Sequence, residues 1–425
     1  MPAGVVALPA DRPRDVEAPR LRTVVVLGML STFGPLSLDL YLPALPQLAD
    51  ELASSPSAAQ LTITACLVGL AAGQLVAGPL SDRYGRRRPL LVGLGAYLAA
   101  SAACALAPSV GVLVLLRLVQ GLAGAAGLVI ARAVARDLYS GRVLVVFFSR
   151  LTLVSGLAPV VAPVLGGQLS RVMDWRGIFL VLAGLGAVLL LAGLAQPESL
   201  PPSRRSSGGL SSTWAAFGML LRDRFFLGTA LACGLAAASM FAYIAGATFV
   251  LQQIYGLSAQ SFSLAFGANS VGIMALSELG ARLGRHWSTV SVLALGLALN
   301  LLGAAALAAT VLLGLGLPFL LGSLFVMVSA LGLVFPTATA LAMSGYPQQA
   351  GTASSLLGLG QFMFGAVVAP LVGVAGEETA VPLGLVALGA SACASLLFLT
   401  VVLPVVRQGR AGPGDGVLAG RPPPG

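Results

Sequence analysis

The sequence predicts an all-α membrane protein with twelve transmembrane helices in two six-helix halves. Of its 425 residues, 57% are hydrophobic and only 9% are charged, whereas soluble proteins are about 25% charged. Apolar stretches long enough to cross a bilayer, which takes roughly 20 residues, recur along the chain. The longest internal polar stretch, 197–224, contains PPSRRSSGG and separates six apolar stretches from six others. The composition therefore disfavours a soluble multidomain protein.

The first predicted span begins after a polar, arginine-bearing stretch. It is too long for the core of a signal peptide and no small-residue cleavage site follows it, so we expect it to be retained. The predicted spans are 22–44, 58–80, 88–107, 110–133, 144–169, 176–196, 225–250, 259–281, 288–312, 314–341, 351–374 and 380–404. The expected units are an N-terminal tail 1–21, a first half 22–196, a central loop 197–224, a second half 225–405 and a C-terminal tail 406–425.

The arginines predict the orientation, because cytoplasmic loops of membrane proteins collect positive charge. All 24 basic residues are arginine. They gather in both tails, in the central loop and after spans two, four and eight, whereas the opposite loops hold Arg171 and Arg176 together with several acids. We therefore expect cytoplasmic termini, and this distribution explains the net charge of +9 without a nucleic-acid partner. The Arg-, Ala-, Gly-, Val- and Leu-rich composition suggests a GC-rich bacterial genome, hence a bacterial plasma membrane.

An internal repeat supports the division into halves. The heptad SDRYGRR at 81–87 is echoed by GARLGRH at 280–286, and APVVAPVLG at 158–166 by GAVVAPLVG at 365–373. The offsets, 199 and 207 residues, are about half the chain. Two halves related as a parallel repeat are typical of secondary transporter folds.

The stretch LDLYLPALP, residues 38–46, places a carboxylate near the outer end of the first span. An ionisable side chain at membrane depth is costly unless it is paired or hydrated, and it marks a functional-site hypothesis. Low-dielectric surroundings favour the protonated carboxyl, whereas a nearby arginine favours the ionised one. We expect Asp39 to take up and release a proton as the protein changes conformation.

Arg117 is the candidate partner of Asp39. It lies seven residues into span four, roughly 10 Å below the outer surface at about 1.5 Å per residue, a depth similar to that of Asp39. The two side chains are thus expected to pair, directly or through water. Gln120, at i+3, faces the same side of the helix and shares the hydrogen bonds of Arg117. A purely structural ion pair, or an arginine satisfied by backbone carbonyls, is the alternative.

The loop GPLSDRYGRRR, residues 78–88, carries more than an orientation signal because Asp82 and Gly85 at fixed offsets are not needed for orientation. Asp82 can meet the positive end of the next helix dipole or pair with an arginine at the cytoplasmic end of span four. A charge lattice that forms in one state and breaks in the other would act as a cytoplasmic gate. The residues assigned to it are Gly78, Asp82, Arg83, Gly85, Arg86, Arg87, Arg132 and Arg136.

This loop resembles the signature loop of the major facilitator superfamily. Further motifs extend the resemblance to about residues 22–405, namely RLVQGLAGAAGLVIARAVARDL (117–138), APVVAPVLGG (158–167), FAYIAGATFVLQ (241–252), GLVFPTATALA (332–342) and GTASSLLGLGQF (351–362). With DLYLPALP, the chain resembles the bicyclomycin-resistance (Bcr/CflA) group of drug:proton antiporters, which includes phenicol exporters. The resemblance implies the major facilitator fold and a proton-coupling role for Arg117.

Span five carries residues that bend a helix and allow close packing, because proline frees a backbone carbonyl and glycine lets neighbours approach. Antiporters of the superfamily share such a motif, which implies export, although the usual Gly-Pro pair is Ala158-Pro159 here. A merely bent packing helix is the alternative. The residues concerned are Gly156, Pro159, Pro163, Gly166 and Gly167.

Aromatic and amide side chains within the spans are candidates for lining a drug cavity, since such cavities are mostly apolar with few polar groups. Each of them, taken alone, is better explained by ordinary packing or by contacts between helices. Tyr243 and Asn269 are the preferred candidates. Glu278 and His286, near the cytoplasmic side, are weak proton-site candidates, and Glu278 is the one rival of Asp39 in the second half. The full set is Phe33, Tyr41, Tyr243, Phe249, Gln252, Asn269, Phe335 and Gln361.

No enzyme, metal or cofactor is expected. The cysteines Cys66, Cys104, Cys233 and Cys393 lack metal-ligand spacing and there is a single histidine. We expect a monomer in a lipid bilayer that exports a small, largely apolar antibiotic, such as a phenicol or bicyclomycin, in exchange for protons. One alternative is a proton-coupled amino acid or sugar transporter, which would place more polar groups in its cavity. The other is a non-transporting receptor or sensor on the same scaffold, which would usually carry a soluble domain.

Overall fold

The computed structural model describes residues 21–139, 147, 161–205, 217–344, 346, 350–373 and 379–407, and every regular element within these ranges is a helix. Ten helices are long and apolar enough to cross a membrane, or eleven if the bent segment Val25–Gly34 plus Leu36–Glu51 is counted. They correspond to eleven of the predicted spans. The fifth, 144–169, lies mostly outside the described residues. The all-helical membrane fold is therefore confirmed, and the count of twelve stays a prediction.

The first half contains α1 (Leu21–Asp39), α3 (Pro56–Tyr84), α4 (Arg87–Ala105), α5 (Val110–Leu138) and α7 (Trp175–Leu194). Residues 161–169 are also helical. The span predicted at 22–44 is not one continuous straight helix. The chain bends by 46° near Pro35, which has no N–H to continue the helical ladder. It then continues as a 3₁₀ turn, η1 (Leu42–Ala44), and a short helix, α2 (Leu45–Glu51).

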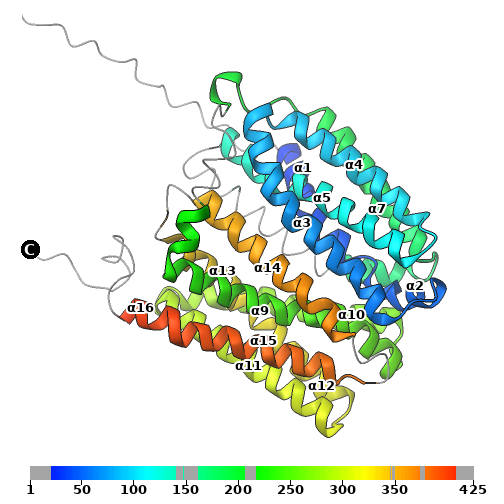
Figure 1. Ribbon diagram of the computed structural model, residues 1–425, viewed down its shortest axis with the longest axis vertical. Coiled ribbons are helices and arrows are strands. Elements are labelled where there is room, and N and C mark those ends of the chain that lie inside the picture. The colour runs from blue at the N-terminus through cyan, green and yellow to red at the C-terminus, as the bar shows by residue number, and fades with distance from the viewer. Residues whose placement is uncertain are drawn as a thin grey trace, which may run out of the picture.

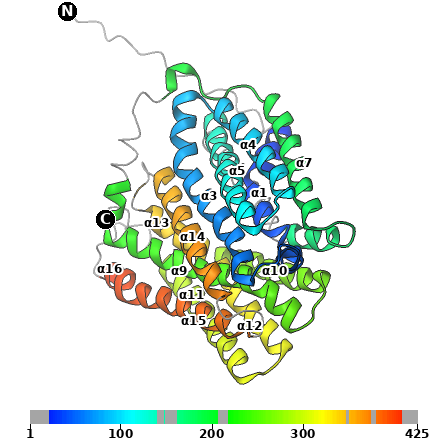
Figure 2. The same cartoon turned by 45° about the vertical axis from the view of Figure 1, so that its right-hand side comes forward.

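The second half contains α9 (Arg224–Phe249), α10 (Ala259–Leu283), α11 (Thr289–Leu313), α12 (Leu317–Ser329), α13 (Leu331–Ser344), α14 (Ala350–Val372) and α15 (Val381–Leu397). Two π-helical segments, η3 (Val250–Ile254) and η5 (Phe398–Val402), extend α9 and α15, and α16 (Leu403–Arg407) follows η5. A further 3₁₀ turn, η2 (Pro202–Arg204), follows α7. The two groups of helices stand side by side, with α3 against α14 between them (Figures 1 and 2).

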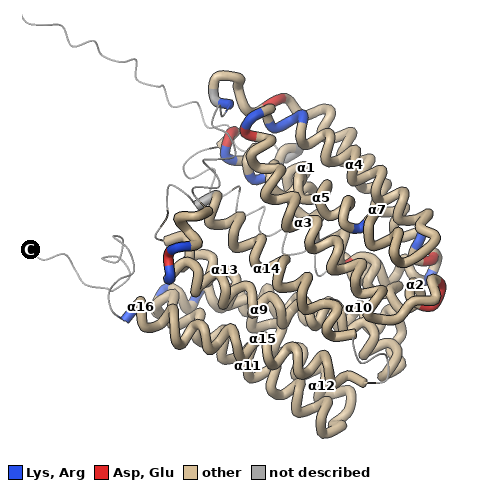
Figure 3. Tube along the Cα trace, in the orientation of Figure 1, with Lys and Arg blue, Asp and Glu red and all other residues tan. Residues whose placement is uncertain are grey.

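Several helices begin at a side chain that accepts a hydrogen bond from an otherwise unpaired N–H of the first turn. Ser55, Asp174 and Ser258 cap α3, α7 and α10, and Asp223 and Ser288 cap α9 and α11. Charged residues gather near the helix ends, which leaves the middle of the bundle almost uncharged (Figure 3). The few charged side chains that do lie inside the bundle therefore need an explanation.

Glycines bring α3 and α5 into backbone contact. A methyl group at Gly69 would collide with the carbonyl oxygen of Leu118, and one at Gly121 with the carbonyl oxygen of Cys66. Such close approach is typical of small-residue packing between membrane helices. It holds the Arg117 turn of α5 directly against α3.

The two halves meet at the end of the bundle that contains η1 and α2, opposite the arginine-rich loops. Five hydrogen bonds join the halves in the described part of the chain, and all lie near this end. They run from Ser57 to the carbonyl of Pro370 (3.4 Å), Gln60 to Ala245 (3.1 Å), Thr64 to Ala366 (3.2 Å), Gln252 to Pro43 (3.2 Å) and Gln260 to Gly167 (2.8 Å). Hydrogen bonding between the halves is thus concentrated at one end.

Candidate functional site

Asp39 is the last residue of α1 and its side chain is buried, with 4% of the residue exposed. Two effects disfavour an ionised carboxylate here: the negative end of the helix dipole and the low-dielectric interior of the membrane. Among the described residues, no ion pair or hydrogen bond holds this carboxylate. The direct Asp39–Arg117 ion pair considered from the sequence is therefore not formed in this structure.

Arg117 is completely buried and finds other partners. Its Nη1 donates to Oε1 of Gln120, and its Nε donates to the carbonyl of Thr62 at 3.4 Å. Its guanidinium lies over the rings of Tyr41 at 4.5 Å and Phe179 at 5.5 Å. The arginine is thus held by an amide, a carbonyl and two aromatic faces.

These four partners of Arg117, namely Gln120, Thr62, Tyr41 and Phe179, form what we call the Arg117 cage. Further polar contacts hold the cage in place. Gln120 donates from Nε2 to the Ser101 hydroxyl at 2.7 Å, and the Tyr41 and Thr62 hydroxyls share a hydrogen bond of 2.9 Å. Nη2 of Arg117 has no hydrogen-bond partner among the described residues. A buried arginine without a carboxylate and with one unused donor is costly. These contacts resemble the alternative of an arginine satisfied by neutral acceptors, and the role of Arg117 in proton coupling stays a prediction.

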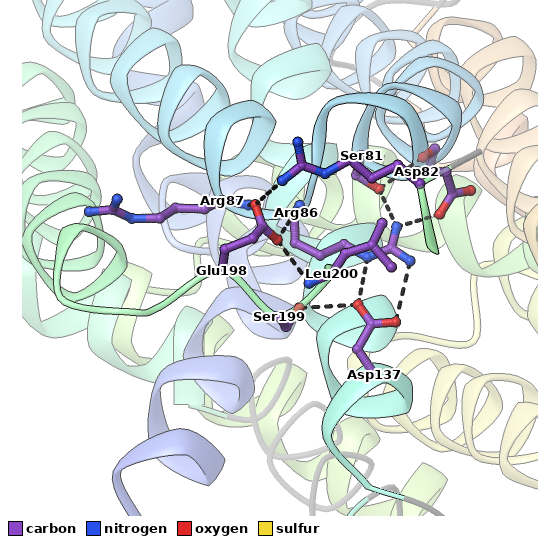
Figure 4. A network of polar contacts seen from close by, with 10 residues as sticks. Ser81, Asp82, Arg86, Arg87, Asp137, Glu198, Ser199 and Leu200 are labelled. Atoms are coloured by element: carbon purple, nitrogen blue, oxygen red, sulfur yellow. Dashed lines mark hydrogen bonds and ion pairs between the residues drawn. The ribbon is translucent and has the colours of Figure 1, made fainter. Parts of the chain in front are cut away.

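A second polar cluster lies at the arginine-rich end and is centred on Arg86 (Figure 4). Arg86 Nη1 pairs with Asp82 at the end of α3 and also donates to the hydroxyl of Ser81 at 2.8 Å. Its Nε donates to Oδ2 of Asp137, at the end of α5, at 2.8 Å. Ser199, beyond α7, donates to the same Asp137 oxygen at 3.1 Å. The Arg86 guanidinium therefore ties three helix ends together, and Asp137 links them to the segment after α7.

Glu198 closes this cluster by capping α4. Its two carboxylate oxygens accept from the backbone N–H groups of Arg86 at 2.8 Å and Arg87 at 3.2 Å, and one also accepts from Leu200 at 3.0 Å. Burial by itself would raise the pKa of Glu198, but the N–H groups of Leu200, Arg86 and Arg87 and the nearby Arg205 outweigh it and lower this pKa. Glu198 is therefore held as a carboxylate at the positive end of α4.

The structure corrects two details predicted for this loop. Glu198, not Asp82, meets the positive end of α4. Asp82 pairs with Arg86 of its own loop, whereas Arg132 and Arg136 on α5 are exposed and form no described ion pair. The acid comes from α5 and the arginine from the loop, the reverse of the expected pairing. All the described members of the cluster belong to the first half or to the start of the central loop, so its action as a gate between the halves stays a prediction.

The remaining loop residues fit around this cluster. Gly85 has φ +89°, a backbone conformation essentially restricted to glycine, and a methyl group there would meet the Glu198 carboxylate. Arg87 donates to the carbonyl of Leu194 at 2.8 Å, and Arg83 lies over the ring of Tyr84. Gly78 packs near Val129 of α5.

Of the span-five residues, Gly156 and Pro159 lie outside the described residues, and Pro163 lies in the described helix 161–169. Gly166 packs on the carbonyl of Leu40, and Gly167 packs on Ser263 of α10 and accepts the hydrogen bond from Gln260. These two glycines thus connect the stretch after Asp39 to the second half.

The candidate cavity residues do not form one group. Phe33 packs edge-on against Tyr97 at 4.3 Å, and Tyr41 belongs to the Arg117 cage. Phe249 lies beside a small cavity at the η1 end, and Gln361 donates to Sγ of Cys233 at 3.2 Å. Only Tyr243 and Asn269 are brought together, by a hydrogen bond of 2.8 Å. Phe335 is partly buried against the core. Binding of substrate by these residues stays a prediction.

Sequence reasoning missed Phe179, Asp137 and Glu198. Phe179 is one aromatic among many in an apolar span, and nothing in the sequence distinguishes it. The acids offered a signal, because each stands alone at the end of an apolar stretch near a surplus of arginines. Cys393 is exposed on α15, whereas Cys66, Cys104 and Cys233 are buried as expected of packing residues.

Comparison with known proteins was made on sequence and on fold. The profile of the Major Facilitator Superfamily matches residues 27–370. A Bacillus subtilis protein named as an uncharacterized MFS-type transporter, YdgK, is 40% identical over 382 residues, covering 89% of this chain and 95% of the relative. A Haemophilus influenzae bicyclomycin resistance protein homolog is 35% identical, covering 89% and 96%. A Pseudomonas aeruginosa chloramphenicol resistance protein is 30% identical, covering 85% and 86%.

Among solved structures, a mutant of the nucleoside transporter NupG superposes with a TM-score of 0.73 at 13% sequence identity, covering 89% of this chain and 99% of that one. At this identity the likeness concerns the fold alone. It agrees with the arrangement of the described helices into two groups.

Proposed function

The chain belongs to the Major Facilitator Superfamily, and on that premise we propose that it exports small, largely apolar antibiotics in exchange for protons. Phenicols and bicyclomycin are the favoured substrate classes, because relatives that align along most of both chains are named for resistance to bicyclomycin and to chloramphenicol. Export proceeds by alternating access, in which two rigid halves expose a central site first to one side and then to the other.

The observation that carries the proton-coupling proposal is the state of Asp39. It is a buried carboxyl at membrane depth that no described hydrogen bond or ion pair holds. Such a group is stable when it carries a proton and becomes unstable when it loses one, unless its surroundings change. A rearrangement of the halves that hydrates Asp39, or brings it to the unused Nη2 of Arg117, therefore favours proton release. Proton binding then favours the arrangement seen here.

The contacts between the halves support one assignment of the conformation. The five hydrogen bonds that join them cluster at the η1 end, which the arginine distribution places on the outside. In this proposal the described structure is the state closed to the outside. Both termini are cytoplasmic, the membrane is the bacterial plasma membrane, the halves divide at the central loop 197–224, and the working unit is a monomer.

Everted membrane vesicles test the proposal. Vesicles that contain the protein should accumulate a radiolabelled phenicol or bicyclomycin when acidified inside, and an uncoupler should abolish the accumulation. Accumulation that the uncoupler leaves unchanged would contradict proton exchange. Accumulation of amino acids or sugars, but of no antibiotic in a panel, would favour the metabolite transporter instead.

A further inference from the structure

The internal repeat relates Asp39 to Tyr243. Equivalent residues of the two halves are separated by 199 residues in one pair of motifs and by 207 in the other. Asp39 and Tyr243 are 204 residues apart, a separation that falls between these two offsets. In a parallel repeat, equivalent positions lie at the same depth on opposite sides of the axis between the halves. The two residues therefore lie within five residues of equivalent positions in α1 and α9.

The surroundings of Asp39 agree with this placement. The η1 turn that follows α1 packs against α9 and α10 of the second half, and Gln252 donates to the carbonyl of Pro43 at 3.2 Å. Asp39 and Tyr243 are both buried and lie within electrostatic range of one another. The turn that follows Asp39 thus borders the second half.

The Tyr243 side chain is held in place on two sides, and the hydrogen of its hydroxyl group remains available for donation. Its ring stacks on Phe266 with centroids 5.1 Å apart, and its hydroxyl oxygen accepts from Nδ2 of Asn269 at 2.8 Å. A tyrosine hydroxyl can accept and donate at once. Because Asn269 supplies a hydrogen, the hydroxyl keeps its own hydrogen for donation, and the described contacts give it no acceptor.

We propose that Tyr243, held by Asn269, is the group of the second half that donates a hydrogen bond to Asp39 when this carboxyl is ionised. The inference rests on the proposed proton exchange and names the residue that transmits it between the halves. A proton from the aqueous phase binds the carboxylate and later leaves it, and the tyrosine keeps its own proton throughout. Tyr243 is a positioning residue in this scheme, because it acts through Asp39.

The other ionisable groups around the end of α1 are engaged elsewhere. Arg117 on α5 is held by Gln120, Thr62 and the ring of Tyr41. The Tyr97 hydroxyl on α4 bonds Ser37 at 2.6 Å and the Tyr41 hydroxyl bonds Thr62. Cys66 on α3 is buried beside Arg117. Tyr243 on α9 is the hydroxyl with a free hydrogen in this set.

The consequence is a measurable shift in pH dependence. A hydrogen bond to an ionised group is roughly twice as strong as one to a neutral group, so losing the hydroxyl penalises the ionised carboxyl more than the protonated one. Tyr243→Phe should therefore raise the pH at which Asp39 is half-protonated by about one unit. Asn269→Leu should produce a smaller shift in the same direction, because a hydroxyl that accepts a hydrogen bond donates more strongly.

Infrared titration of the purified full-length protein in lipid tests this without requiring transport. The C=O stretch of protonated Asp39 is the band that Asp39→Asn lacks, and its growth is followed as the pH falls. The inference expects the midpoint to rise in Tyr243→Phe and in Asn269→Leu but not in Tyr255→Phe, a tyrosine beyond η3. Unmoved midpoints in both variants, with the band still present, would overturn it.

Transport in everted vesicles then distinguishes a failure of the proposed function from a failure of the inference on Tyr243. If the wild-type protein accumulates no antibiotic while the infrared midpoint moves as expected, the contact stands and the proposed function fails. If the wild-type protein exports by proton exchange while Tyr243→Phe lowers export equally at every pH, Tyr243 serves packing or substrate binding and the inference fails.

Discussion

Replacing Asp137 by asparagine tests whether the Arg86 cluster stabilises the first half. Asp137 stands at the C-terminal end of α5, where the helix dipole disfavours a negative charge, so its presence there depends on Arg86. The exposed fractions of the Arg86 and Asp137 side chains are 10% and 16%, and they meet at 2.8 Å. Asparagine keeps the shape of the residue and removes its charge.

The expected loss follows from two opposing effects. A hydrogen bond between charged groups contributes about 1.5–3 kcal/mol, and removing a carboxylate from a helix C-terminus regains about 0.3–1 kcal/mol. The free energy of unfolding should therefore fall by about 1.5 kcal/mol. A unit the size of one half then melts about 3–6 °C lower.

Thermal unfolding of the purified protein, followed by tryptophan fluorescence, measures the shift. Glu278→Gln is the matched control, because it breaks an exposed ion pair, Arg282–Glu278 at 2.9 Å, of the kind that contributes little. Adding Arg86→Gln to Asp137→Asn should cost less than the sum of the single variants, since the two residues share one interaction. A melting shift no larger than that of Glu278→Gln, or strictly additive losses, would refute the reasoning.

Three further predictions concern single positions. Gly85→Ala should lower the free energy of unfolding by about 1–3 kcal/mol, because a side chain is strained at φ +89° and the methyl group would meet Glu198. The control Gly95→Ala, in open space on α4, should not lower it. Equal melting temperatures of the two variants would contradict this. The pKa of Glu198 is lowered in the folded state, so the stabilisation by its carboxylate is present above the ordinary glutamate pKa and is lost as the pH falls through the folded-state pKa. Glu198→Gln should therefore make the melting temperature fall less steeply as the pH is lowered. An unchanged slope would contradict this. Gly373→Ala should push the η1 end open, because its methyl group would lie 2.8 Å from Cα of Ser57. The readout is a cysteine introduced at Thr379 in a Cys393→Ser background. This cysteine should react faster with an impermeant maleimide when Gly373→Ala is present than when the control substitution Gly389→Ala is present.

The helices were predictable because each span is a long apolar stretch whose hydrophobicity alone specifies insertion. The burial of Asp39, and the contact between Arg117 and Gln120 one turn apart on the same helix, also followed from local spacing. The bend near Pro35 could have been predicted from the proline itself. It was missed because the apolar stretch continues unbroken through it.

Partners that come from different helices were harder to predict. Whether Arg86 meets Asp137 or Asp82 meets Arg136 depends on how the ends of α3 and α5 rotate against one another. The hydrophobic pattern does not determine that rotation, because lipid-facing and protein-facing positions are almost equally apolar. For the same reason the rings of Tyr41 and Phe179 over Arg117 could not be selected among the aromatic residues.

Asp39→Asn in everted vesicles tests the central claim most directly. The variant keeps a side chain of the same size that cannot bind or release the coupled proton, so it should insert and fold but accumulate no antibiotic against a gradient under an imposed pH difference. It should still equilibrate the antibiotic down its own gradient. Full uphill accumulation by Asp39→Asn, abolished by an uncoupler as in the wild-type protein, would contradict the account.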